Sequence, residues 1–202
     1  MADFRAIEGT TQALVRLLQA SYDAGDFGHD LLFQAYVPES FQTPMTAGVS
    51  VFLYRIAVDG VHRMPPGRLD PDGTRRHPHL PLDLHYLLTF WARDASLQHR
   101  LAGWTMRTIE DTAVLPHGLL EAAAPGVFEP DETVQLVPAE LANEDLFRIW
   151  DVLGQSRYQL SVPYLARNVV VESRRPRDEG EPVQERRSDW AVVEGWSLSE
   201  GA

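Results

Sequence analysis

The clearest hydrophobic pattern in the chain lies between Pro81 and Leu115, and its period changes partway along. The first half alternates with a period of two residues, as a strand does when its two sides meet different surroundings. The second side of this strand is mixed at its start, because Asp83 and His85 come first and Leu87, Thr89 and Trp91 follow. The first side is wholly apolar and consists of Leu82, Leu84, Tyr86, Leu88 and Phe90. The alternation predicts a long strand well inside a sheet.

The second half of this stretch has the spacing of an amphipathic helix. Asp94 is a good N-cap residue, and apolar positions recur after it at helical intervals. The predicted buried stripe consists of Leu97, Leu101, Trp104 and Thr108, widened by Ala102, Met106 and Ile109. We expect this helix to pack back over the sheet, with Trp104 as its anchor.

The N-terminal region has a second helical stripe. Asp3 is placed to cap a helix of about five turns, and Gly25 lies beyond its end. The stripe consists of Phe4, Ile7, Thr11, Leu14 and Leu18. We expect this stripe to face the sheet. The following Gly25–Gly28 stretch is predicted to be a glycine-punctuated turn, because the surroundings of a kinase magnesium motif are missing.

Further elements complete an α+β pattern. Strands are predicted at Leu31–Val37, Gly48–Val58, Thr133–Val137 and Tyr158–Val171, and a helix capped by Asn143 runs to Leu153. Together the elements predict a mixed, largely antiparallel β-sheet with flanking amphipathic helices, in one domain over residues 1–171.

Two residues predict where their strands lie. Arg55 falls on the same side as Val49, Val51 and Leu53, near the far end of its strand, where it can reach solvent or pair with a carboxylate. Pro163 cannot donate a ladder hydrogen bond, so the last strand is expected at a sheet edge or to contain a bulge. On one side of that strand we place Tyr158, Leu160, Val162 and Tyr164.

Composition changes at Glu172, and residues 172–202 are predicted to form a charged linker followed by an interaction arm. The segment from Trp190 to Trp196 contains two tryptophans and two valines, which is a poor signature of disorder. We therefore identify Trp190, Val192 and Trp196 as candidate protein-interface residues that bind by strand addition. The alternative is that this segment folds back as an extra strand on its own domain.

The loop at positions 61–80 is rich in proline, glycine, arginine and histidine, and connections of this length tend to be functional. His62, His77, His79 and His85 allow the alternative hypothesis of a small metal-binding enzyme. Pro78 interrupts the local geometry, and no third ligand has convincing spacing. A loop that orders against a neighbouring subunit is the preferred interpretation, and we predict no metal site and no cofactor.

No catalytic residues are predicted. Ser161 lacks the flanking glycines of a nucleophile elbow, and no convergent set of nucleophile, base and oxyanion donors is visible. The chain is therefore expected not to be an enzyme.

Composition excludes several classes of function. The 202 residues suit one domain with a small appendage, and the lack of cysteine excludes disulfides and cysteine zinc sites. The net charge of −11 argues against a nucleic-acid partner, because neutralising phosphates requires clustered cations. All 18 basic residues are arginine, which either a GC-rich genome or selection for bidentate carboxylate contacts explains. No membrane span and no signal peptide are visible, so we expect a cytoplasmic protein.

The packing residues follow a recognisable order and spacing between Phe4 and Val171. The stretches are GVSVFLYRIAVDG, LDLHYLLTFWA, LQHRLAGWTMRTIEDTAVL and RIWDVLGQSRYQLSVPYLARNVVV. In these stretches the chain resembles the N-terminal domain of the tail-terminator or cap proteins of contractile injection systems. These systems are phage-tail-like particles in which a sheath surrounds an inner tube.

The resemblance implies a tail-terminator-like fold and a structural role. It implies a hexameric ring that caps the end of tube and sheath remote from the baseplate and fixes particle length. The implied partners are other copies of the chain, the sheath protein and the inner-tube protein, within an assembled cytoplasmic particle. A different tail-completion or connector subunit with the same fold remains an alternative, because fold alone does not separate these roles.

Overall fold

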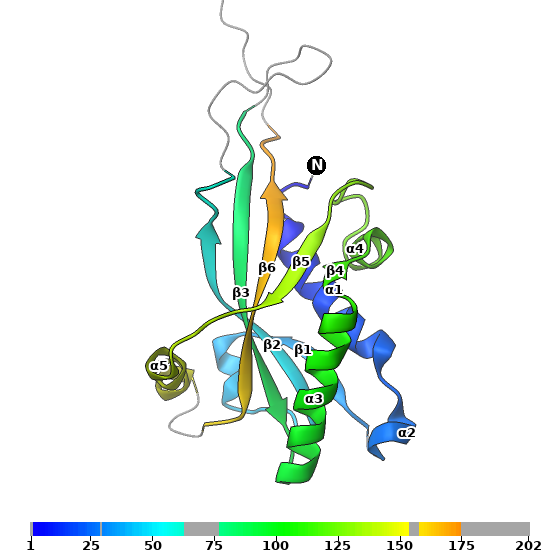
Figure 1. The fold of residues 1–202 in the computed structure, drawn as a ribbon, viewed down its shortest axis with the longest axis vertical. Helices are drawn as coiled ribbons and strands as arrows, with labels where there is room; N and C mark the ends of the chain where they lie inside the picture. Colours follow the sequence, from blue (N-terminus) through cyan, green and yellow to red (C-terminus); the bar gives the residue numbers. More distant parts are fainter. Residues whose placement is uncertain (1, 29, 63–76, 154–157, 175–202) are drawn as a thin grey trace, which may run out of the picture.

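The computed structural model describes residues 2–28, 30–62, 77–153 and 158–174. They form a curled six-stranded sheet in the order β1-β2-β3-β6-β5-β4, in which β1 and β2 are parallel and the other neighbours are antiparallel (Figure 1). The strands are β1 (Leu32–Tyr36), β2 (Gly48–Val58), β3 (Leu80–Trp91), β4 (Val114–Leu115), β5 (Val134–Pro138) and β6 (Ser161–Val171). The mixed, largely antiparallel α+β fold predicted from the sequence is confirmed.

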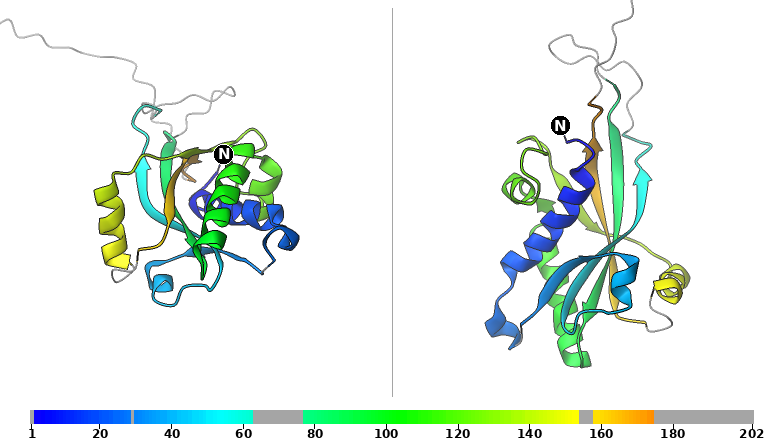
Figure 2. Two further views of the ribbon diagram at one scale, coloured as in Figure 1. Left: turned by 60° about the horizontal axis from the view of Figure 1, so that its bottom comes forward. Right: turned by 180° about the vertical axis from the view of Figure 1, so that it is seen from behind.

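Helices cover the two faces of the sheet unequally, as the two views in Figure 2 show. The larger group packs on the first face and consists of α1 (Ala6–Ser21), α2 (Ala24–Phe27), α3 (Ala95–Asp111) and α4 (His117–Ala123). The short 3₁₀ helix η1 (Pro38–Phe41) and α5 (Asn143–Leu153) lie on the second face. The sheet therefore has one fully built core and a smaller one opposite it.

Strand β3 lies at the centre of the sheet, as its alternation predicts. Leu82, Leu84, Tyr86, Leu88 and Phe90 all belong to the large core on the first face, and all are nearly or fully buried. The Tyr86 hydroxyl group shares a hydrogen bond of 2.8 Å with the hydroxyl of Thr11 on α1, and burial raises the pKa of Tyr86. This hydrogen bond ties the N-terminal helix to the central strand.

The second face carries a compact aromatic cluster under η1 and α5. Its buried members are Tyr36, Phe41, Phe52, Leu87, Trp91 and Trp150. The rings of Phe41 and Trp150 meet edge to face at a centroid distance of 5.6 Å, a geometry that aromatic pairs favour. The Trp91 indole N–H donates to the Ser50 hydroxyl at 2.8 Å, so this buried N–H group has a hydrogen-bond partner. These contacts hold α5 against the lower half of the sheet.

The face predicted for Arg55 is wrong. A β-bulge between Leu53 and Arg55 shifts the register, so that Arg55 lies opposite His85 on the second face. Arg55 is exposed there, as expected, but on the opposite side from the one predicted. A bulge adds one residue to a strand and so reverses the alternation beyond it, and this stretch contains no glycine or proline to mark the bulge.

Of the two alternatives predicted from Pro163, the sheet edge is wrong, because β6 lies between β3 and β5, whereas β6 does contain a bulge. The Pro163 carbonyl accepts a hydrogen bond from the Ala139 N–H at 3.0 Å, just beyond the end of β5. Backbone groups of one residue in an antiparallel strand point to the same side, so the missing N–H of Pro163 removes no bond to β3. The irregularity in β6 lies further on, between Ala166 and Val169, where Asn168 has a positive φ of 63°.

Three apolar side chains lie outside the stripes predicted for them. Phe4 is 65% exposed because α1 begins at Ala6, and Met106 is 40% exposed because Thr105 takes the buried position on α3. Tyr158 precedes β6 and contacts Phe147 and Trp150 on the side of α5. The turn predicted around Gly25 contains the short helix α2, which ends at Gly28 with a left-handed φ of 67°.

Candidate interaction surfaces

The histidines of the metal-site hypothesis do not form a ligand cluster in the part of the chain that the structure describes. His62 pairs with Asp59, and His85 lies on β3 beside the Tyr54 ring. His77 and His79 precede β3, and the structure gives no group of three or more possible ligands among the described residues. Positions 63–76 of the predicted contact loop lie outside these residues. The described histidines therefore give the metal-binding alternative no support.

Ser161 is buried, and its hydroxyl group is hydrogen-bonded within the sheet. Its hydroxyl group lies 3.0 Å from the Thr89 hydroxyl and donates to the Gln159 carbonyl at 2.9 Å. Both hydroxyl groups belong to buried residues on neighbouring strands, so the pair satisfies polar atoms inside the sheet. No base is positioned to activate Ser161 in these contacts, and the described geometry gives no reason to assign it a catalytic role.

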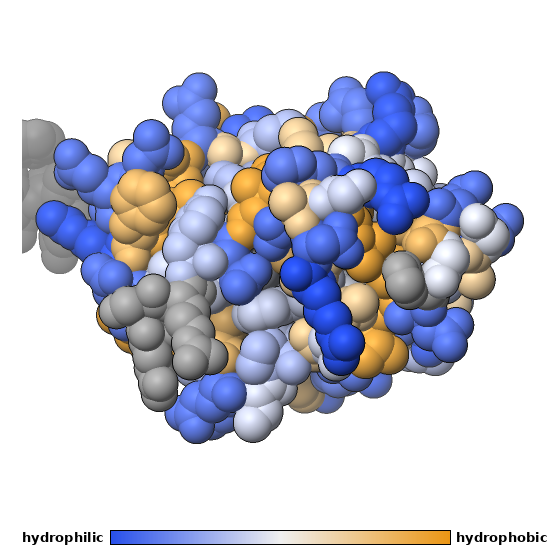
Figure 3. All heavy atoms as spheres, turned by 90° about the horizontal axis from the view of Figure 1, so that it is seen from below, coloured by the Kyte–Doolittle hydropathy of each residue, from blue (hydrophilic) through white to orange (hydrophobic). Residues whose placement is uncertain are grey.

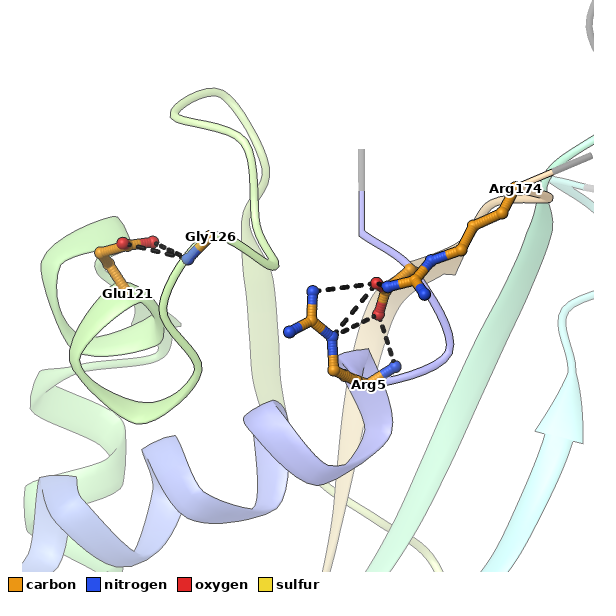
Figure 4. A network of polar contacts seen from close by, with 5 residues as sticks. Arg5, Glu121, Gly126 and Arg174 are labelled. Carbon is orange, nitrogen blue, oxygen red and sulfur yellow. Dashed lines mark hydrogen bonds and ion pairs between the residues drawn. The ribbon is translucent and has the colours of Figure 1, made fainter.

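The residues around the N-terminus hold it against the end of β6 (Figure 4). The Asp3 carboxylate accepts hydrogen bonds from the Arg5 backbone and side chain and pairs with Arg174, and the Glu172 N–H donates to the Ala2 carbonyl at 2.8 Å. The hydrogen bonds from Arg5 are the main reason why the pKa of Asp3 lies far below its usual range. Exposed ion pairs contribute little to the free energy of unfolding, so the main effect of these contacts is to fix the position of the N-terminus relative to β6. The end of β6 therefore lies beside the N-terminus.

The outer side of α5 is the first surface available for contact. Phe147 is 52% exposed and Val152 is 83% exposed, although the helix already buries Trp150 on its inner side. A shallow hollow of about 300 Å³ lies between α5 and β2 and is lined by Phe52, Tyr54, Arg148, Ile149, Val152 and Leu153. Viewed from below, apolar atoms also appear on the side where α5 lies, interspersed with hydrophilic ones (Figure 3).

The upper half of β2 is the second such surface. Strand β1 pairs only with Gly48–Phe52, so beyond that point β2 is an outer strand among the described elements (Figure 1). Ile56 is 48% exposed and Val58 is 50% exposed. Both faces of this strand are therefore covered only in its lower half, Gly48–Phe52. The sequence does contain a signal for this difference, because Pro38 limits β1 to a shorter length than β2.

The predicted interface residues Trp190, Val192 and Trp196 lie outside the described residues, and so does most of the predicted segment at 172–202. The structure therefore does not test their assignment. The described residues contain no helix that is both long and apolar enough to cross a membrane.

Comparisons with known proteins identify the fold. A family model described as the Pvc16 N-terminal domain matches residues 9–185. A cryo-EM structure of the sheath/tube terminator of PVC, an extracellular contractile injection system in its extended state, has a TM-score of 0.60 at 22% identity. The tube-terminating cap of the anti-feeding prophage, also solved by cryo-EM, has a TM-score of 0.59 at 18% identity. A search of curated proteins gave no match.

The chain covers only part of these two structures. The alignment with the PVC terminator includes 94% of this chain and 64% of the other, and that with the prophage cap includes 90% and 60%. At such identities the likeness shows the fold alone. This chain therefore spans less than two thirds of the length of either terminator.

Proposed function

The chain belongs to the Pvc16 N-terminal domain family, and we propose on this basis that it is a structural terminator of a contractile injection system. In this role it closes the end of the inner tube and sheath remote from the baseplate and fixes particle length. The single observation that carries the proposal is the family match over residues 9–185, on a chain whose fold is that of two solved terminators.

The distribution of surface features supports a role in contact. The large core is closed under α1, α3 and α4, whereas apolar side chains remain exposed on α5 and on the upper half of β2. Monomeric proteins tend to keep exposed apolar patches small, and larger or clustered ones mark interaction sites.

The proposed assembly is a hexameric ring of this chain on the last layer of tube and sheath. A ring closes through a heterologous contact, in which two different surfaces of the same chain meet. The sheath protein and the inner-tube protein are the proposed partners, within a particle assembled in the cytoplasm. The residues 172–202 are proposed as a linker and interaction arm, with Trp190, Val192 and Trp196 as its anchors.

Deletion of the gene followed by electron microscopy of purified particles tests the proposed function. We expect sheathed tubes of uncontrolled length, or tubes without a sheath, and restoration of a narrow length distribution when the gene is supplied in trans. Particles of normal and uniform length in the deletion strain would contradict the proposal.

A further inference from the structure

Among the described elements, the upper half of β2 presents a regular strand edge that pairs on its inner side alone. Residues Arg55–Val58 pair one-to-one with β3 on their inner side, from Arg55 opposite His85 to Val58 opposite Leu82. On their outer side no described strand pairs with them, since β1 ends its pairing at Phe52. An edge of this kind carries backbone N–H and C=O groups that another extended segment can pair with.

The side chains on this edge favour such pairing. Ile56 and Val58 lie on the first face and are 48% and 50% exposed. Leu80 of the neighbouring strand β3 lies on the same face and is 39% exposed. Proteins commonly blunt an exposed edge with charges, proline or a bulge. Here the bulge lies at the lower end, before Arg55, and leaves the apolar part regular.

We propose that this edge, Arg55–Val58, accepts the segment Trp190–Gly195 of a neighbouring copy of this chain. The inference rests on the proposed ring, for which it supplies the contact between copies. In an extended segment Trp190 and Val192 fall on the same side, which matches the apolar side formed by Ile56, Val58 and Leu80. The added strand completes the sheet through backbone hydrogen bonds, and the alternating side chains set its register.

The geometry places donor and acceptor at the same end of the molecule. Strand β6 ends at Val171, opposite Leu80 of β3, and Leu82 lies opposite Val58 of β2. The chain from Arg175 to Asp189 spans up to roughly 50 Å when extended, which is enough to reach an adjacent copy. Because donor and acceptor are different surfaces of one chain, repeated donation produces a head-to-tail assembly that can close into a ring.

The absence of cysteine makes the contact directly testable by disulfide trapping. Four double variants of the full chain combine Ile56→Cys or Val58→Cys with Trp190→Cys or Val192→Cys. They are oxidised in the presence of purified tubes and run on non-reducing gels. A disulfide requires Cβ atoms about 4 Å apart, and residues directly opposite each other on paired strands have Cβ atoms about 5 Å apart. If the segment pairs with this edge, we therefore expect at least one cysteine pair to give a ladder of covalent oligomers. The matched control is Val114→Cys, which is 48% exposed on β4 at the opposite edge, combined with the same donor cysteines; it should give no ladder.

The remaining outcomes separate a failure of the strand exchange from a failure of the proposed function. A faster-migrating monomer means that the segment fills the edge of its own domain. Tube-end binding without any cross-link means that another surface closes the ring, and this leaves the proposed function standing. A ladder from a protein that never appears on tube ends supports the strand exchange but contradicts the proposed function. Comparing the melting temperature of each reduced variant with that of the parent protein identifies any variant that fails to fold, and the remaining cysteine pairs on the same edge then decide.

Discussion

The two halves of β2 differ in their surroundings, although they belong to one continuous strand. Gly48–Phe52 has β1 on one side and β3 on the other, and its residues are buried on both faces. Arg55–Val58 has β3 on one side only, and Ile56 and Val58 are half exposed. The same strand therefore contributes packing at one end and an available surface at the other. This division separates the residues that hold the domain together from those that we expect to contact other subunits.

The largest expected effect on the free energy of unfolding comes from a residue that packs beside the buried half of β2. Phe90 pairs with Val49 and is fully buried in the large core. Replacing it with alanine removes most of a buried aromatic side chain and leaves a cavity, so Phe90→Ala should lower the free energy of unfolding by about 3–5 kcal/mol. Urea unfolding followed by tryptophan fluorescence measures the change. The matched variant Val58→Ala, in the open half, should change it by less than ~0.5 kcal/mol; equal losses in both variants would abolish the distinction between the halves.

A smaller effect is expected for the anchor of α3. The Trp104 ring lies 5.6 Å from the rings of both Phe27 and Phe33, but part of it remains accessible. Trp104→Ala should therefore cost about 3 kcal/mol, at the lower end of the range for large aromatic residues. The double variant of His77 and His79 to alanine should stay within ~0.5 kcal/mol of the parent protein, since both residues precede β3 in a proline-flanked loop. Should the histidine pair cost as much as Trp104, the division into loop and core is wrong.

The large core was predictable from the sequence because its pattern is long and regular. The alternation from Leu82 to Phe90 predicts both the strand and its buried side, and the Asp94 cap predicts where α3 begins, with its carboxylate accepting from the Leu97 N–H at 2.9 Å. Two kinds of local signal, spacing and capping, agree over this stretch. Such agreement identifies elements reliably because each signal has a separate physical cause.

The open half of β2 was not predictable in the same way. Alternation shows that residues share a face, but it does not show whether another element covers that face. The bulge before Arg55 reversed the assignment beyond it, and Ile56 and Val58 carry the same apolar character whether covered or exposed. Whether each half of β2 has a neighbour on its outer side depends on β1, which is a separate segment of the chain. The shorter length of β1 was the one indication in the sequence that the two halves differ. The candidate interface at Trp190–Trp196 rests on sequence pattern and on the proposed strand exchange.

The smallest expected effect is a pH dependence of stability that comes from His85, which lies on the second face opposite Arg55. Burial, and then the nearby Arg55 charge, lowers the pKa of His85, while Asp83 partly opposes this. The unfolded chain therefore binds a proton at His85 more readily, so stability is lost as the pH falls below 6.5 toward the lower folded pKa. We expect a small decrease in melting temperature between pH 7.5 and pH 5.5. His85→Gln, beside the unchanged Tyr54, should reduce this decrease; an identical decrease in the variant would show that other groups cause it.

The central claim is that this chain terminates a contractile particle. Cryo-EM of particles purified from a strain that carries an antibody epitope inserted after Gly60 locates the protein directly, provided that the tagged strain keeps the parental length distribution. We expect six-fold density bound by the antibody at the end of tube and sheath remote from the baseplate, and its loss in the deletion strain. Antibody bound along the sheath, at the baseplate, or nowhere on intact particles of normal length would contradict it.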